Sequence, residues 1–131
     1  MPQSTENTKK IPKYTKEYIQ ENLQKAFQNA SKLANDYLEE NGEGMLNCGF
    51  AWVTVSPARG MLVNMLKEQY GVRAGQSYCS YGYPVAGITV WNPSRTYAQD
   101  ITAKELGCLG FVEVLEKAFP EYTFKLHSRL D

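Results

Sequence analysis

The sequence predicts an α/β fold in which helices pack on a small three-stranded sheet that is at least partly parallel. Three observations lead to this class. A long apolar stripe at helical spacing opens the chain, two runs rich in β-branched and aromatic residues follow, and a helical segment comes after each run. Strands joined by helical crossovers are usually parallel, so we expect the order α-β-α-β-α-β. An α+β fold with an added hairpin is the alternative, because residues 72–83 are rich in Tyr and Gly.

The first element is a long helix expected over residues 15–40, and Asn41-Gly42 provides its stop signal. Residues 1–13 are polar and aperiodic, which predicts a flexible arm followed by a single domain at 14–131. The helix carries more apolar surface than a three-stranded sheet covers, so we expect it to form a homo-oligomer. Its apolar positions recur every three or four residues: Tyr18, Ile19, Leu23, Ala26, Phe27, Ala30, Leu33, Ala34, Tyr37 and Leu38.

The first strand is expected at residues 48–55. Apolar side chains alternate onto both of its faces, which predicts a central strand covered on two sides, with Phe50 and Trp52 buried. Ser56-Pro57 is typical of a helix N-cap followed by the first helical residue. A second helix is therefore expected over residues 57–70.

Residues 84–91 form the second expected strand. The spacing of Thr102 and Glu105 is that of a capping box, which predicts a third helix that ends just before Pro120. Alternating apolar and polar residues at 122–130 predict a half-exposed last strand.

Small residues interrupt the third helix. Gly107 and Gly110 lie on one face together with Ala103 and Val114. Glycine in a helix interior costs about 1 kcal/mol relative to alanine, so we expect this face to approach another backbone closely.

Composition argues against several classes of function. Acidic and basic residues are equal in number, 14 each, and neither half of the chain has the basic excess of a protein that binds duplex DNA irrespective of sequence. No apolar run approaches the roughly 20 residues that cross a bilayer, and the N-terminus lacks the apolar region of a secretory signal. The cysteines at 48, 79 and 108 fit no zinc spacing. We expect three reduced thiols, at least two of them in or near the core, a cytoplasmic location, and no membrane, metal or cofactor.

The stretch best suited to function is residues 69–99, which contain no Asp or Glu. Aromatic faces stack on bases, arginine binds phosphate at two points, and both residue types dominate protein interfaces. Three interpretations stay open: a solvated loop whose rings cover the sheet, a protein interface, or a site for a nucleotide-like or other anionic ligand. The stretch holds two arginines, one tryptophan and five tyrosines: Arg73, Arg95, Trp91, Tyr70, Tyr78, Tyr81, Tyr83 and Tyr97.

The turn after Trp91 is the sharpest local feature. Pro93 is expected to hold Asn92 extended, and Ser94 and Arg95 then lie beyond the end of a strand, where open α/β sheets bind ligands. The alternative is a turn in which Asn92 and Ser94 bond their own backbone. The binding residues expected to share a cleft or interface belong to this turn and to the segment before it: Trp91, Asn92, Ser94, Arg95, Arg73, Tyr78, Tyr81 and Tyr83.

A small enzyme acting on a nucleotide or protein substrate is a second interpretation. A nucleophile at Cys48 or Cys79 would need a base, and His127, the single histidine, is expected on the polar face of the last strand without an obvious partner. Asp100 and Glu105 are a candidate acid–base pair, but the cap already explains Glu105. Glycine-rich phosphate loops of known spacing are absent from the sequence, which therefore favours binding over catalysis.

Four segments, in this order, resemble short uncharacterised proteins encoded by tailed bacteriophages: NCGFAWV at 47–53, WNPS at 91–94, DITAKELG at 100–107 and SRLD at 128–131. The likeness covers about residues 47–131 and leaves out the first helix. The group has no established activity, so it transfers no functional residue. The resemblance implies a phage product that acts in the bacterial cytoplasm, where it binds a host factor or sequesters a defence signal.

These observations predict a small phage-like binding protein whose partner is a host protein or a small anionic, nucleotide-like ligand. A structural or assembly component that oligomerises through the first helix is the third interpretation.

Overall fold

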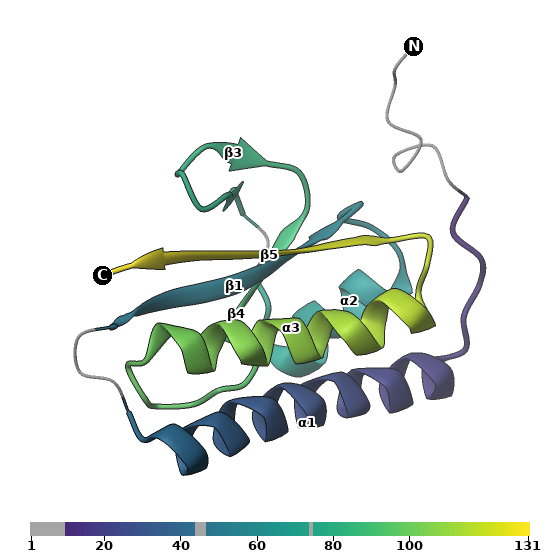
Figure 1. The fold of residues 1–131 in the computed structure, drawn as a ribbon. Coiled ribbons are helices and arrows are strands. Elements are labelled where there is room, and N and C mark those ends of the chain that lie inside the picture. The colour runs from purple at the N-terminus through teal and green to yellow at the C-terminus, as the bar shows by residue number, and fades with distance from the viewer. Residues whose placement is uncertain (1–9, 44–46, 74) are drawn as a thin grey trace.

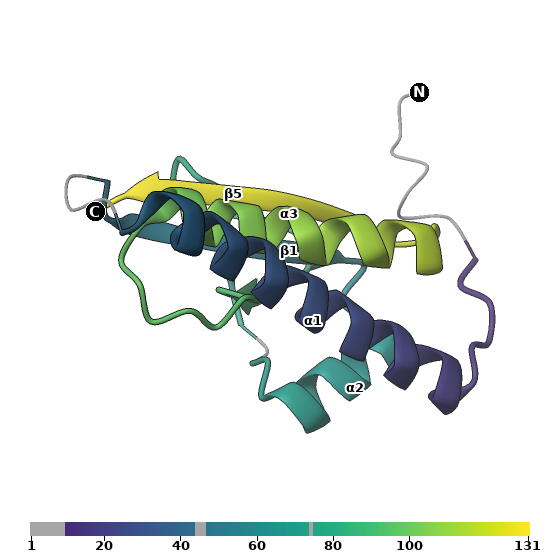
Figure 2. The ribbon, with the colours of Figure 1, turned by 60° about the horizontal axis from the view of Figure 1, so that its bottom comes forward.

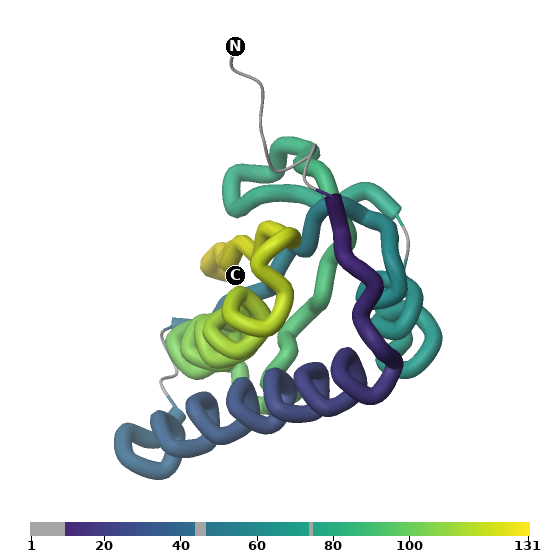
Figure 3. Tube along the Cα trace, turned by 90° about the vertical axis from the view of Figure 1, so that its right-hand side faces the viewer, coloured from purple at the N-terminus to yellow at the C-terminus, as the bar shows by residue number. Residues whose placement is uncertain are grey.

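The computed structural model of the chain describes residues 10–43, 47–73 and 75–131. The helices lie on one face of a sheet, and a small hairpin stands over the opposite face (Figure 1 and Figure 3). The predicted mixed α/β class is confirmed. The elements follow the chain in this order: α1 (Lys16–Asn41), β1 (Gly49–Ser56), α2 (Met61–Tyr70), β2 (Ser77–Tyr78), β3 (Pro84–Val85), β4 (Ile88–Trp91), α3 (Ile101–Ala118) and β5 (Thr123–Leu130).

The three-stranded sheet is antiparallel and has the order β4-β1-β5. β1 is central, with Gly49 opposite Leu130 on β5 and Trp52 opposite Trp91 on β4. The predicted parallel pairing is therefore wrong. β4 and β5, which α3 connects, do run in the same direction, because each is antiparallel to β1; however, β1 lies between them.

The tyrosine-rich segment forms the hairpin that the α+β alternative included. β2 pairs with β3 in a separate two-stranded sheet. Gly87 has a φ of 108°, and a Cβ atom there would lie 2.3 Å from the carbonyl oxygen of Val55, so the single strand predicted at 84–91 is divided into β3 and β4. In the sequence, both α2 and the hairpin lie between β1 and β4. The connection from β1 to β4 is therefore not a single helical crossover, and β4 runs antiparallel to β1.

α2 begins later than predicted. Ser56 is still paired with Thr123 in the sheet, and Gly60 precedes the helix with a φ of 99°, outside the helical region. Residues 57–60 therefore connect β1 to α2, and the N-cap predicted at Ser56 is wrong. The end of α2 at Gly71, whose φ of 68° is left-handed, is as predicted.

Asp100, and not Thr102, caps α3. The Asp100 carboxylate accepts a hydrogen bond from the backbone N–H of Thr102 at 2.8 Å, and a negative charge at this helix end is also favourable for the helix dipole. Glu105, predicted to complete a capping box, instead accepts a hydrogen bond from the hydroxyl of Ser128 on β5 at 2.6 Å. The helix ends before Pro120, as predicted.

The apolar stripe of α1 packs inside the domain, with α3 running alongside it (Figure 2). The side chains that reach the core from this helix are fully buried: Ile19, Leu23, Ala26, Ala30 and Ala34. Tyr18, at 40%, is the exposed large apolar side chain of α1. The homo-oligomer expected through this helix stays a prediction, since most of the stripe already has a partner within the chain.

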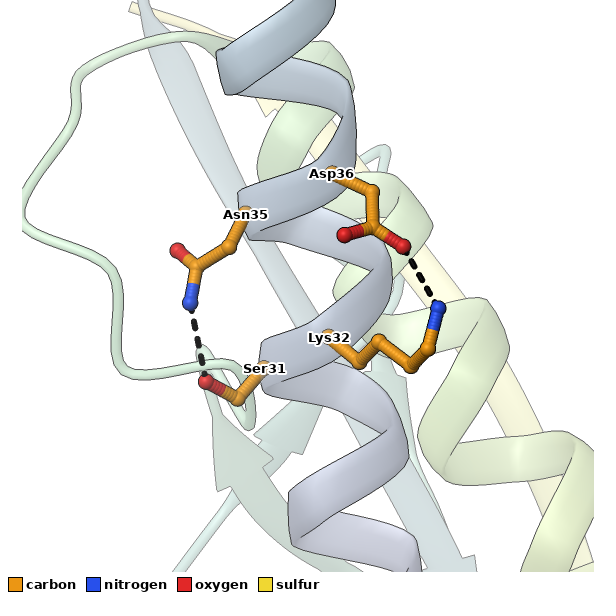
Figure 4. A network of polar contacts seen from close by, with 4 residues as sticks. All are labelled: Ser31, Lys32, Asn35 and Asp36. Atoms are coloured by element: carbon orange, nitrogen blue, oxygen red, sulfur yellow. Dashed lines mark hydrogen bonds and ion pairs between the residues drawn. The ribbon is translucent and has the colours of Figure 1, made fainter.

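The outer face of α1 is polar. Lys32 forms an ion pair with Asp36 at 2.6 Å, and the Asn35 amide donates a hydrogen bond to the hydroxyl of Ser31 at 3.3 Å (Figure 4). Because both pairs are exposed to solvent, they contribute little to the stability of the fold. Of the predicted N-terminal arm, residues 1–9 lie outside the described residues, whereas Ile11 packs against the core.

The glycines of α3 permit close contact with α1, as predicted. A Cβ atom on Gly107 would lie 2.5 Å from Cβ of Ser94 and 3.4 Å from the carbonyl oxygen of Ala30. At Gly110 the carbonyl accepts a hydrogen bond from the Asn29 amide at 3.0 Å. The two helices therefore approach at the level of their backbones, and the turn after β4 is pressed against the same place.

We expect Gly107→Ala to lower the free energy of unfolding by about 1–3 kcal/mol, because the added methyl group overlaps Ser94 in a filled space. Helix propensity alone would predict a gain of roughly 1 kcal/mol. Urea denaturation followed by circular dichroism measures the difference. Adding Ser94→Gly should recover part of the loss, and a Gly107→Ala variant as stable as the wild type would contradict the packing described.

Candidate functional site

The sheet face opposite the helices is aromatic. Pairing across the strands places Trp52 of β1 between Trp91 of β4 and His127 of β5. The Trp52 and Trp91 rings stack with centroids 5.3 Å apart and an interplanar angle of 15°, and the Trp52 and His127 rings stack at 5.9 Å. Trp52 is 6% exposed, which confirms its predicted burial, whereas Phe50, predicted to be buried as well, is only partly buried. Trp91 is 55% exposed. The Trp52 indole is therefore part of the packed structure, whereas the Trp91 indole is accessible to a ligand.

The turn after β4 is held by its own polar groups. The Asn92 amide donates to the carbonyl of Thr96 at 3.1 Å and accepts from the hydroxyl of Ser94 at 3.1 Å. Asn92 has a φ of 44°, so the extended conformation predicted for it is wrong; asparagine tolerates this region when its side chain bonds locally. Asn92 and the buried Ser94 therefore shape the turn, as the alternative interpretation proposed, and Arg95 is the exposed residue that the turn presents.

Arg95 lies over a pair of stacked rings. Its guanidinium carbon is 5.1 Å from the ring centroid of Phe27 on α1 and 5.8 Å from that of Tyr70 on α2. Those two rings stack at 4.4 Å with an interplanar angle of 21°. A guanidinium that contacts ring surfaces can still donate N–H hydrogen bonds to an additional partner.

The depression around Arg95, which we call the arginine cleft, has a volume of about 410 Å³. It lies among α1, the end of α2, the segment before β2, and β4. Among the described residues, no Asp or Glu lines it. Its lining combines cations with rings, an amide and a hydroxyl: Phe27, Tyr70, Gly71, Val72, Arg73, Gly75, Gln76, Thr89, Val90, Trp91 and Arg95.

The charges at the arginine cleft favour an anion. Within the described ranges, the side-chain ion pairs join lysines and acidic residues of α1, and neither involves Arg73 or Arg95. The carbonyl end of α2 also lies here, and a helix end carries about half a negative charge. The side chains that line the cleft therefore carry two full positive charges, against the partial negative charge of the helix end.

A second depression, the tryptophan cleft, lies between the hairpin and the sheet and has a volume of about 450 Å³. The indole N–H of Trp52 donates to the carbonyl of Tyr78 at 2.8 Å, and the backbone N–H of Ser128 donates to the hydroxyl of Ser80 at 3.0 Å. These bonds hold the hairpin over the sheet. The cleft is lined by Trp52, Gln76, Tyr78, Cys79, Ser80, Gly82, Thr89, Trp91 and Arg129.

The structure brings part of the expected site together. Trp91 lines both clefts, Arg73 and Arg95 line the arginine cleft, and Tyr78 lines the tryptophan cleft. Asn92 and Ser94 are not among the lining residues of either. The expected single cleft is therefore two adjacent clefts that meet at Trp91.

Three other tyrosines line neither cleft. Tyr81, Tyr83 and Tyr97 are 88%, 70% and 99% exposed, so they do not cover the sheet. Sequence reasoning missed Phe27 and Arg129, which lie outside the acid-free stretch. A signal for Arg129 was present, since none of the sequences of β1, β4 and β5 contains an acidic residue.

His127 and Glu105, two of the groups considered for catalysis, have structural partners. Nε2 of His127 is 2.9 Å from the hydroxyl of Thr54, and Glu105 bonds Ser128. Burial, with the nearby Glu105 charge, raises the pKa of the Cys108 thiol to about 12, which disfavours the nucleophilic thiolate. Hydrogen bonds from the backbone of Tyr81 and Tyr83 lower the pKa of Cys79.

The chain matches no known protein-family model, no curated protein and no solved structure. In the part of the chain that the structure describes, no cluster of His, Cys, Asp or Glu could hold a metal ion. Within the same residues, the helices are too short or too polar to cross a bilayer.

We expect Trp52→Ala to lower the free energy of unfolding by about 3–5 kcal/mol, because it removes a buried indole and its bond to the hairpin. Trp91→Ala is the matched control. It removes the same side chain from the opposite register position, where the ring is 55% exposed, and should cost much less. Chemical denaturation measures the free energy of unfolding of both variants. Equal decreases would contradict the expectation that the buried indole contributes more to stability than the exposed one.

The titration of His127 gives a prediction on pH. Burial, and secondarily the Lys125 charge, lowers the pKa of His127 below its ordinary value of 6.5. The unfolded chain therefore takes up this proton first as the pH falls below about 6.5, so stability is complete above that pH and decreases below it. His127→Gln should remove this part of the pH dependence. Urea unfolding of both proteins at pH 7.5 and 5.5 measures it, and parallel curves would contradict the assignment.

Proposed function

We propose that the protein is a binding protein for a small anionic ligand with a planar ring, of the nucleotide type, and that the arginine cleft is its site. One observation carries the proposal: the Arg95 guanidinium contacts the rings of both Phe27 and Tyr70 inside the arginine cleft. The same cleft contains Arg73, and no described carboxylate lines it. Guanidinium groups bind phosphate oxygens at two points, and rings supply a stacking surface. The volume of the cleft falls in the range of small-ligand sites.

The biological setting that we propose follows the bacteriophage resemblance. The protein would act in the cytoplasm of an infected bacterium and sequester a nucleotide-like signal of the host defence. Free thiols at all three cysteines are compatible with that compartment. Native mass spectrometry of protein purified from infected cells tests the setting, because a sequestered ligand should remain bound and give a mass of its own.

A host protein is the second candidate partner, and the exposed tyrosines support it. Tyr81 and Tyr83 at the tip of the hairpin and Tyr97 in the loop before α3 point away from the core. Tyrosine is enriched in the central contacts of protein interfaces. Changing all three to Ser should abolish binding of a host protein and leave nucleotide binding unchanged, which separates the two candidates.

We expect Arg95→Glu to weaken the binding of adenosine monophosphate at least tenfold, because it removes a charged donor and places a negative charge beside the phosphate. Arg95→Lys should bind with intermediate affinity, since lysine keeps the charge and loses the planar fork. Isothermal titration calorimetry measures both. Both variants should remain folded. An exposed substitution changes the free energy of unfolding by about 0.5 kcal/mol, and the loss of the cation–π contact lowers it by about 0.5–1 kcal/mol more.

Arg59→Glu is the matched control. Arg59 is exposed and lines neither cleft, and its substitution changes the net charge by the same amount. It should leave the affinity for adenosine monophosphate within about twofold of the wild type. Equal affinities of the wild type and Arg95→Glu would overturn the proposed function, as would an absence of binding to the wild type.

A further inference from the structure

The arginine cleft and the tryptophan cleft are neighbours with a common wall. Gln76, Thr89 and Trp91 line both, so β4 separates them, with the Trp91 ring at the boundary. Their volumes, about 410 and 450 Å³, are similar. A mononucleotide bound in one cleft would leave the other vacant.

The tryptophan cleft has the same chemistry as its neighbour. Trp91, 55% exposed, offers ring surface, and Arg129 supplies a cation. The Arg129 guanidinium carbon is 5.7 Å from the ring centroid of Phe50, which in turn lies 5.7 Å from that of Trp91. The second cleft therefore repeats the pattern of the first: an arginine placed over an aromatic ring, beside a further ring.

The charges continue across the boundary. Arg73 and Arg95 lie on one side of Trp91 and Arg129 on the other, and no described Asp or Glu lines either cleft. A ligand group that extends past Trp91 from one cleft into the other lies near arginines on both sides. A phosphate linkage fits that position, because its charge would be shared between guanidinium groups from different elements.

We infer that the ligand is a dinucleotide: two bases joined by a phosphate linkage that straddles Trp91, with one base in each cleft. This inference rests on the proposed function of the arginine cleft and extends it to the tryptophan cleft. It makes Arg129 a specificity-determining residue, since Arg129 contacts only a ligand that reaches the second cleft.

The experiment compares adenosine monophosphate with the 5′-phosphorylated adenine dinucleotide and trinucleotide by isothermal titration calorimetry on the full chain. We expect the dinucleotide to bind at least about tenfold more tightly than the monophosphate, because it adds a stacked base and a shared phosphate. The trinucleotide should bind within about threefold of the dinucleotide. An equal affinity for the monophosphate and the dinucleotide would overturn the inference, as would an affinity that keeps increasing at the trinucleotide, which would indicate a longer strand.

Variants distinguish this inference from the proposed function. Arg129→Ala should remove most of the advantage of the dinucleotide and leave the affinity for the monophosphate unchanged, whereas Arg95→Ala should weaken both. Lys125→Ala is the control, because Lys125 is exposed on the same face of β5 and lines neither cleft. If Arg129→Ala behaves like Lys125→Ala while Arg95→Ala still loses the monophosphate, the dinucleotide inference fails and the proposed function stands. Circular dichroism confirms that each variant is folded.

Discussion

The structure depends on one constraint: β1 is apolar on both faces and must be covered on both. Ala51 and Val53 point toward the helices and are fully buried there, whereas Trp52 points the other way and is only 6% exposed. Helices cover the first face completely. Among the described residues, the short hairpin covers the second face, and Trp52 itself helps to hold it through its indole N–H. The tryptophan cleft is the space that this partial cover leaves, and the arginine cleft adjoins it beyond β4.

The same packing positions the cation of the arginine cleft. Gly107 lets α3 and the turn after β4 approach so closely that Ser94 is buried, and Ser94 bonds Asn92 to fix the turn. Arg95 then extends from a defined backbone position onto Phe27 and Tyr70. Gly107 on α3 thus packs against the turn from which Arg95 extends. We therefore expect stability and binding to be coupled at this corner of the domain.

The sequence was sufficient for features that depend on local periodicity and insufficient for those that depend on distant contacts. The stripe of α1 and the central, two-sided character of β1 follow from spacing alone. The relative direction of the strands cannot be predicted from spacing, because the position of β1 between β4 and β5 depends on packing between distant parts of the chain. Likewise the acid-free stretch pointed to Trp91 and Arg95. Phe27, which is far from this stretch in the sequence, joins the site through its contacts with Tyr70 and Arg95.

The stack of Trp52 on Trp91 has an optical consequence. These are the only tryptophans in the sequence, and both line the tryptophan cleft, while Trp91 also lines the arginine cleft. Indole emission changes when a base stacks against the ring or when water is displaced from it. The chain therefore contains its own fluorophore at the place where a ligand would enter, and occupancy can be followed by tryptophan emission without attaching a dye.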